Sequence, residues 1–246
     1  MTITTNEAQT QGSLALKPTA TVIDLPVAKK EWIDSSRTSR GIKKAEAADP
    51  IREAEDIVRI AEYLLTHGKN QWYGYRNRMA FVLGVSTGLR VSDLLRIKIE
   101  DVLNEDGTIV DYLRIQEKKT RKYNDPKIGT AAKTAIAEYL ASLESFTSEE
   151  YLIRSERGGK LDESQLYRTL SAVEKGLNLP YHFSTHTMRK TYGYWTIRNN
   201  PNDNMALIHL QMMFNHSSPQ TTLTYCGINR EEEDKYYNGI NEMFSM

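Results

Sequence analysis

Hydrophobic residues recur every three to four positions over most of the chain after residue 50, and this spacing predicts a largely helical domain. The first such segment, residues 50–68, places one apolar stripe on a helix that stops at Gly68. The stripe comprises Ile51, Ala54, Ile57, Val58, Ala61, Leu64 and Leu65. Further helices are predicted over 74–88, from 90 onward, and over 131–143, 162–177 and 184–198, with two or three short helices after that.

Residues at the expected helix ends support these boundaries. Gly88 is a typical C-terminal stop, since glycine adopts the left-handed conformation there without strain. Asp162 and Gln165 have the spacing of a capping box, and either Ser184 or Thr185 can cap the helix that follows.

The period changes between residues 108 and 128, where Tyr112, Arg114 and Gln116 alternate with Leu113 and Ile115. Such alternation is typical of a strand with one buried face. It breaks at a basic cluster and resumes toward residue 128, which predicts a hairpin with its lysines at the turn. The fold class is therefore mainly α with one small β-hairpin.

The two ends of the chain differ from the middle. Residues 1–49 show no sustained periodicity and are predicted to form a flexible, largely disordered arm, which leaves residues 50–246 as one domain. The last segment predicts a C-terminal helix with apolar residues to bury, either on its own domain or on a neighbouring subunit. These residues are Tyr236, Tyr237, Ile240, Met243 and Phe244.

Composition limits the class of protein. The chain of 246 residues is 39% hydrophobic and 26% charged, as expected for a protein with a real core. It contains one cysteine, no long apolar run and no secretory signal, so we predict a cytoplasmic protein without disulfides or membrane contact. The 32 basic residues balance the 32 acidic ones, which disfavours a nucleic-acid binder. However, residues 201–246 hold two basic and six acidic residues, so the preceding part carries a basic excess.

Five places along the chain carry groups suited to chemistry, although each alone also has an ordinary structural explanation. They are Arg90 with Asp93, the basic cluster 118–122, His186 with Arg189, His216, and Tyr225. An isolated Arg-x-x-Asp is more often a surface ion pair, and lysines at a hairpin turn are usually solvated. The sequence contains no metal-binding motif, no glycine-rich phosphate loop and no serine nucleophile motif. We therefore predict no metal and no cofactor.

Together these groups suit transesterification at a phosphodiester. Two guanidinium groups can bind one phosphate in a bidentate manner and neutralise charge that develops on its oxygens. A tyrosine hydroxyl can act as a nucleophile and form a covalent intermediate. Histidine exchanges protons near neutral pH, and lysine can protonate a leaving oxygen if its pKa is lowered.

The order and spacing of these motifs resemble the tyrosine recombinase (phage integrase) family. The stretch "STGLRVSDLLRI" resembles its first arginine motif, "EKKTRK" its lysine hairpin, "HTMRKTYG" its His-x-x-Arg motif, and "NHSSPQTTLTY" the segment from the last histidine to the nucleophile. The resemblance covers the chain from about residue 50. It implies the fold of the recombinase catalytic domain, a DNA breaking and rejoining enzyme.

The resemblance also implies residue roles. Tyr225 would attack the scissile phosphate and form a 3′-phosphotyrosyl bond, with neither metal nor ATP. Arg90 and Arg189 would hold the phosphate, and His216 would bind one of its oxygens. His186 would move the proton of the tyrosine, Asp93 would support that region, and Lys119 would protonate the leaving oxygen, with Lys118 as the competing choice. The expected DNA-binding residues are Lys118, Arg121, Lys122 and Lys190.

Three departures from the family pattern bear on these expectations. The usual glycine before the last histidine is Asn215, and the usual leucine before the second arginine is Met188. The first fifty residues are too few for the DNA-binding domain that many relatives carry before the catalytic one, so the chain resembles catalytic-domain-only members or a piece of a longer integrase. Half a clamp predicts weaker, more salt-sensitive DNA binding.

The expected partners are double-stranded DNA, further copies in a homotetramer on that DNA, and an accessory DNA-bending protein; a bacterial, phage or mobile-element origin fits these. Two alternatives remain at this stage. One is DNA relaxation of the type IB topoisomerase kind, which uses the same phosphate chemistry. The other is a regulator of the same fold that binds DNA without cleaving it.

Overall fold

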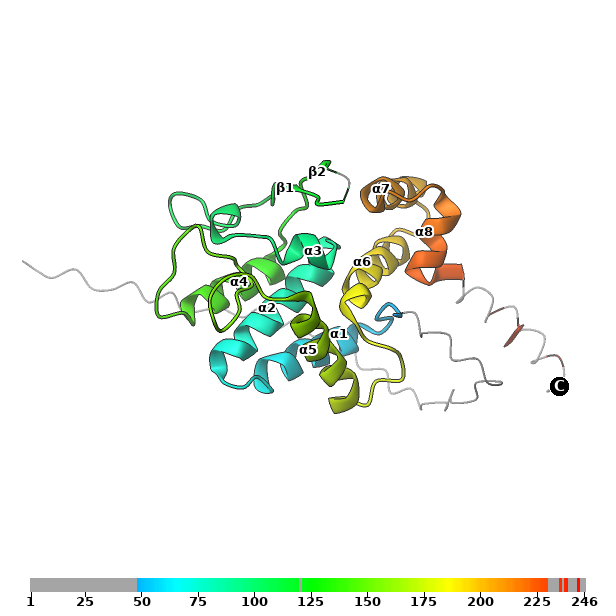
Figure 1. Cartoon of the computed structure of the whole chain (residues 1–246). Helices are drawn as coiled ribbons and strands as arrows, with labels where there is room; N and C mark the ends of the chain where they lie inside the picture. The colour runs from blue at the N-terminus through cyan, green and yellow to red at the C-terminus, as the bar shows by residue number, and fades with distance from the viewer. Residues whose placement is uncertain (1–47, 120, 230–234, 236, 239–242, 244–246) are drawn as a thin grey trace, which may run out of the picture. The chain divides into compact units, whose positions relative to one another are not determined.

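A computed structural model describes residues 48–119 and 121–229, together with positions 235, 237, 238 and 243. The domain is mostly helical, with one small hairpin, as the sequence predicts (Figure 1). Its elements are α1 (Ala54–Thr66), α2 (Gln71–Thr87), α3 (Val91–Leu94), the 3-10 turn η1 (Ile99–Asp101), β1 (Ile115–Gln116), β2 (Tyr123–Asn124), α4 (Thr130–Ala141), α5 (Glu163–Gly176), α6 (Thr185–Asn199), α7 (Asn204–Phe214) and α8 (Pro219–Cys226).

Helix α1 shows where the predicted apolar stripe was wrong. Ile60 and Leu64 are buried, but Val58 is 57% exposed. The buried position one turn before Ile60 belongs instead to Asp56, which accepts hydrogen bonds from Arg59 and from the hydroxyl of Tyr181. A paired carboxylate therefore takes a core-facing position that hydrophobicity alone assigns to its neighbours.

The turn between α2 and α3 brings the first arginine motif to the centre of the domain. Gly88 ends α2 in the left-handed conformation, with φ of 60°, and its carbonyl accepts a hydrogen bond from the Arg189 side chain. A side chain at this position would also collide with the ring of Tyr192. Arg90 then caps α3, which is only four residues long, so the predicted third helix is shorter than its pattern indicates.

The hairpin forms as predicted, although its strands are short. β1 and β2 pair antiparallel, with Ile115 opposite Asn124 and Gln116 opposite Tyr123. Leu113 and Ile115 are buried while their neighbours are exposed, which confirms the alternation in the sequence. The predicted cap Asp162 also forms, but its carboxylate accepts from the backbone N–H of Ser164 and makes no capping box.

Among the described residues, two hydrophobic clusters form, and α6 contributes to both. The larger cluster includes Met188 on α6 and unites α1 to α5. The smaller consists of Leu210, Phe214 and Cys226, with Tyr225 packed against it. Helices α6, α7 and α8 contact one another around this second cluster, as Figure 1 shows at the right of the view. Helices α7 and α8 therefore fold with α6 around a small core beside the arginine motif.

Two predictions concern the ends of the chain. The flexible arm falls almost entirely on residues 1–47, and most of the predicted C-terminal helix falls on residues 230–246; both lie outside the described residues apart from single positions. Across the part of the chain that is described, no helix has the length and apolar character needed to cross a bilayer.

Candidate active site

Arg90 and Arg189 are far apart in the sequence but close enough in the fold for their charges to interact. Arg189 is buried on α6, where it donates to the carbonyl of Gly88 at 2.6 Å and to that of Met213 at 3.4 Å. Its guanidinium lies 4.2 Å from the ring centroid of Phe214. Arg90 donates to the carbonyl of Phe214 at 3.1 Å. Backbone carbonyls and one aromatic ring thus hold two cations side by side, as a phosphate site requires.

The electrostatic cost of this pair is visible in Arg189. Burial, together with the neighbouring charge of Arg90, lowers the pKa of Arg189 to about 10. The charges of Tyr225, Glu117 and Asp93 act in the opposite direction. An anion bound between the guanidinium groups would relieve the same repulsion.

Two carboxylates border the arginine pair, and the sequence predicted only one of them. Asp93 is fully buried, and its Oδ1 accepts from the backbone N–H of Lys118 at 2.9 Å. Its other oxygen is buried without a hydrogen-bond partner among the described residues. Glu117 forms a 2.6 Å ion pair with Arg90 Nη1. Sequence reasoning missed Glu117, although its place at the end of an alternating strand marks it as an inward-facing carboxylate.

His216 and Tyr225 meet beside the arginines. Their ring centroids lie 5.1 Å apart, and both rings contact the edge or face of Phe214. His216 Nδ1 is 3.1 Å from Thr222 Oγ1, so the hydroxyl-rich segment between the two residues orients the imidazole. Burial, followed by the charges of Arg189 and Arg90, lowers the pKa of His216, which favours the neutral ring.

Tyr225 is half-buried near the C-terminal end of α8, on the side that faces the arginine pair. Burial raises the pKa of its hydroxyl, while the nearby charges of Arg189 and Arg90 oppose that rise. Lys190 Nζ lies 5.1 Å from the centroid of its ring. A phenol held this close to two guanidinium groups can be deprotonated more easily than burial alone would permit.

Asn215 shows how the chain manages without the family's glycine. It adopts the left-handed conformation, with φ of 56° and ψ of 47°, and ends α7. Asparagine tolerates this conformation better than most residues, because its short polar side chain can bond locally. The turn that delivers His216 is therefore retained.

The predicted His-x-x-Arg pair is split by the structure. His186 lies in the first turn of α6, which Ser184 caps, so the capping prediction is confirmed for Ser184. The imidazole of His186 is exposed and makes no side-chain hydrogen bond within the described part of the chain, whereas Arg189 one turn later is buried. His216, and not His186, is the histidine beside Tyr225.

The basic residues predicted to bind DNA also separate into two groups. Lys118, Lys119, Arg121 and Lys122 have exposed side chains at the hairpin turn, and Lys122 Nζ is 3.5 Å from Asn215 Oδ1. Lys190 differs: it is half-buried beneath the ring of Tyr225, and burial lowers its pKa. Its ammonium therefore contacts the ring of the tyrosine, and its role in DNA binding stays a prediction.

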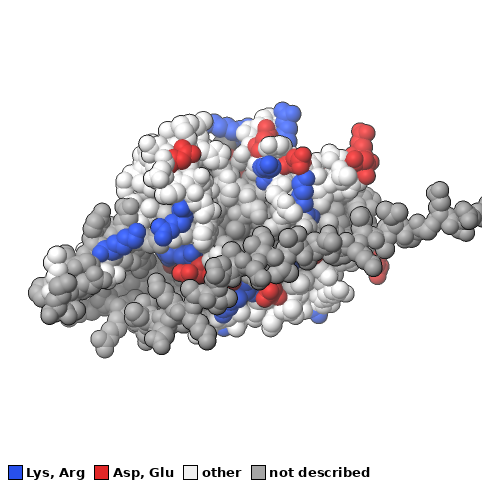
Figure 2. Space-filling view, turned by 180° about the vertical axis from the view of Figure 1, so that it is seen from behind, with Lys and Arg blue, Asp and Glu red and all other residues white. Residues whose placement is uncertain are grey.

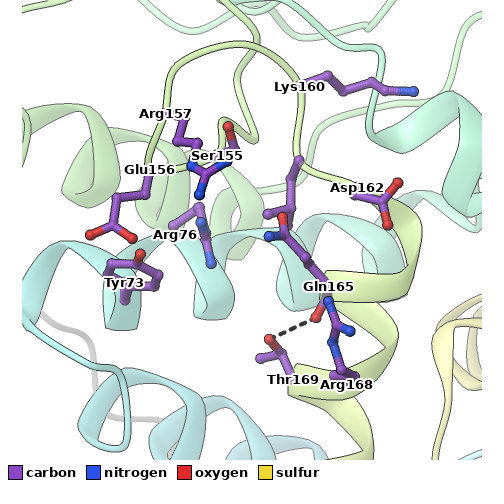
Figure 3. Close-up of a pocket in the computed structure, with 11 residues that line it drawn as sticks. Tyr73, Arg76, Ser155, Glu156, Arg157, Lys160, Asp162, Gln165, Arg168 and Thr169 are labelled. Carbon is purple, nitrogen blue, oxygen red and sulfur yellow. Dashed lines mark hydrogen bonds between the residues drawn. The ribbon is translucent and has the colours of Figure 1, made fainter.

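Other surfaces add little to this site. A cavity of about 680 Å³ between α2, α5 and the loop 154–160 shares no lining residue with it (Figure 3). Arg76 in that cavity already donates to Asn77 and to the carbonyl of Arg154, so it has a structural role. On the face seen in Figure 2, basic and acidic side chains are interspersed. Among the described residues, no three His, Cys, Asp or Glu side chains gather as metal ligands.

Comparison with known proteins gives a consistent result. The model of the phage integrase family matches residues 52–232. The probable integrase/recombinase YoeC of Bacillus subtilis is 33% identical over 183 residues, which cover 74% of this chain and 91% of YoeC. The tyrosine recombinase XerC of Rickettsia bellii is 26% identical over 184 residues, 74% of this chain and 57% of XerC.

Solved structures share the fold at lower identity. The XerA recombinase has a TM-score of 0.57 and 21% identity, covering 78% of this chain and 64% of its own. A lambda integrase dimer bound to a COC′ core site has a TM-score of 0.54 and 19% identity, covering 74% and 49%. The chain thus spans 49% to 64% of these longer relatives and 91% of YoeC.

Proposed function

The chain belongs to the phage integrase family of tyrosine recombinases, and on this premise we propose that it cleaves and rejoins DNA at specific sites through Tyr225. The observation that carries the proposal is the convergence of Tyr225, His216, Arg90 and Arg189 around Phe214. Their functional groups match the needs of phosphoryl transfer from one oxygen to another.

The reaction is a transesterification. The Tyr225 oxygen attacks the scissile phosphorus and loses its proton, and the bond from phosphorus to the 5′ oxygen breaks. This leaves a 3′-phosphotyrosyl bond and a 5′ hydroxyl. Because one phosphoester replaces another, the bond energy is conserved and rejoining is the same step in reverse. We therefore expect the reaction to proceed without ATP, and the two arginines to stabilise the transition state in place of a metal ion.

Each remaining group has a role in this step. Arg90 and Arg189 bind the non-bridging oxygens, and His216 donates a hydrogen bond to one of them. His186 serves proton transfer when DNA covers the start of α6. Asp93 holds the hairpin through the Lys118 N–H, and Lys119 protonates the 5′ oxygen. Lys118 is the alternative proton donor.

The partner of this site is double-stranded DNA. One structural relative is a lambda integrase tetramer bound to a Holliday junction, with a TM-score of 0.53. By analogy, we propose a homotetramer on two DNA sites, with an accessory DNA-bending protein as a further partner. The exposed lysines and Arg121 at the hairpin turn supply contacts to the DNA backbone.

Covalent trapping tests the proposal directly. The protein is incubated with fragmented genomic DNA of the organism that encodes it, denatured in detergent, and the DNA that stays attached is sequenced. We expect one short site to be enriched by wild type and lost with Tyr225→Phe, which removes only the nucleophilic oxygen. Equal recovery with both proteins would contradict the proposal, and relaxation of supercoiled DNA without strand exchange would favour the topoisomerase alternative.

A further inference from the structure

We infer that Glu117 is a positioning residue, which fixes the lysine-bearing turn of the hairpin against Arg90 and so places the proton donor for the leaving oxygen. This inference rests on the proposed function. It concerns a residue to which no role is assigned above, although it begins the stretch "EKKTRK", and it assigns to a carboxylate a part in a reaction on an anionic substrate.

The backbone of Glu117 closes the turn that carries the lysines. Its N–H donates to the carbonyl of Lys122 at 2.9 Å, and its carbonyl accepts from the N–H of Arg121 at 3.0 Å. Arg121 takes the left-handed conformation, with φ of 61°, which lets the chain reverse within these few residues. Glu117 therefore forms the base of the tight turn that carries Lys118, Lys119, Arg121 and Lys122.

The side chain of Glu117 joins this base to the phosphate site. Only 5% of the side chain is exposed, and its Oε2 lies 2.6 Å from Arg90 Nη1. Lys118, the next residue, is bound to the first arginine motif as well, because its N–H donates to Asp93 Oδ1 at 2.9 Å. Two adjacent residues of the hairpin are thus tied to two residues of the first arginine motif.

Charge explains why a carboxylate stands where a phosphate must bind. Arg90 and Arg189 repel each other, and the negative charges of Glu117 and Asp93 counter that repulsion at Arg189. Without these carboxylates, the buried guanidinium of Arg189 and the half-buried one of Arg90 would repel each other before any DNA arrives, at a high electrostatic cost. The Glu117 carboxylate, which belongs to the hairpin, neutralises part of this charge and so couples Arg90 to the turn.

The consequence for catalysis is one of geometry. A general acid must lie within hydrogen-bond reach of the atom that it protonates, and a shift of about 1 Å can slow a reaction by about a hundredfold. Lys118 and Lys119 have exposed, long side chains, so their reach is set by where the base of the turn lies. Loosening Glu117 is expected to slow proton delivery while leaving most DNA contacts in place.

The structural half of the inference is tested without DNA. Amide hydrogen exchange of the segment 113–124 is compared among wild type, Glu117→Gln and Glu138→Gln. The last is a matched control, because Glu138 also pairs with an arginine, Arg78, but far from the hairpin in sequence. We expect faster exchange at Lys118 and Arg121 in Glu117→Gln alone; unchanged exchange would overturn the inference.

The catalytic half uses a duplex that contains the trapped site, with either the normal 5′ oxygen or a bridging sulfur at the scissile bond. A thiolate leaves without being protonated, so a sulfur substrate does not need the general acid. We expect Glu117→Gln to cleave the normal duplex roughly ten- to hundredfold more slowly than wild type. It should cleave the sulfur duplex at close to the wild-type rate, with DNA affinity little changed.

Other outcomes separate the possible failures. A defect that persists with sulfur would overturn the assignment to proton delivery and locate it at Arg90 instead. Normal cleavage of both duplexes would overturn the catalytic role even if exchange were faster. If wild type forms no Tyr225-dependent adduct at all, the proposed function fails, and the exchange comparison still decides whether Glu117 holds the hairpin.

Discussion

The imidazole of His216 lies edge-on to the ring of Tyr225, with centroids 5.1 Å apart and planes inclined by 64°. The two residues are brought together by the turn after α7 and by α8, and both rest on Phe214 beneath Arg189. A polar pair at the edge of a small hydrophobic core is therefore fixed before substrate binds.

Anions are expected to stabilise the fold by binding between Arg90 and Arg189. Sulfate should raise the melting temperature above that in chloride at equal ionic strength. At a sulfate concentration of a hundred times its Kd, the free energy of unfolding should increase by about 2.7 kcal/mol. The effect should disappear in Arg189→Gln and persist in Arg168→Gln, a surface arginine of α5. Thermal unfolding followed by circular dichroism measures it, and an equal response of all three proteins would contradict an anion site here.

Tyr225 is expected to ionise at a higher pH than a solvated tyrosine, which is about half ionised at pH 10. Burial raises the pKa of the Tyr225 hydroxyl, and the charge of Arg189 opposes part of that rise. Removing that charge in Arg189→Gln should therefore raise the pKa of Tyr225 further. The ¹³C shift of the tyrosine Cζ, assigned by loss of the signal in Tyr225→Phe, reports both values. A lower pKa in Arg189→Gln would refute this view of the site.

Gly193→Ala is expected to destabilise the domain and impair cleavage together. A Cβ at this position of α6 would lie 2.4 Å from the Cys226 sulfur and 3.0 Å from the Phe214 ring. Such overpacking typically costs about 1–3 kcal/mol, and relief requires α8 to move with Tyr225. Urea unfolding and the trapping assay measure the two effects. Gly129→Ser, at the N-cap of α4 where nothing lies within 4 Å, is the control and should lower neither.

Lys190→Met is expected to slow covalent cleavage with little effect on DNA affinity, because the ammonium contacts the ring of Tyr225. A cation–π contact contributes about 1 kcal/mol, or roughly a fivefold change in rate. Lys190→Arg should retain most of the rate. Lys122→Met should show the reverse behaviour, with weaker binding and a salt dependence reduced by about one phosphate contact. Binding and single-turnover cleavage at several salt concentrations separate the two; equal behaviour would mean that Lys190 is an ordinary DNA contact.

Several features of the fold could be predicted because they depend on local patterns. Backbone geometry sets the period of the helical stripes and of the alternation around Leu113 and Ile115. The stop at Gly88 reflects the ease with which glycine adopts the left-handed conformation. Val58 was misplaced for a related reason. Hydrophobicity predicts which residues prefer burial, but Asp56 is buried because it accepts hydrogen bonds from Arg59 and Tyr181. Tyr181 lies far from Asp56 in the sequence, so the local pattern does not reveal it.

The sequence by itself determined the inventory of the site, since the types and spacing of Arg90, Arg189, His216 and Tyr225 already indicated phosphate chemistry. Only the tertiary structure decided which groups meet. It brought His216 rather than His186 to Tyr225, placed Lys190 beneath the ring, and paired Glu117 with Arg90. The physical reason is that a side chain's chemistry is local, whereas its burial and its charged neighbours depend on segments that contact each other only in the folded chain.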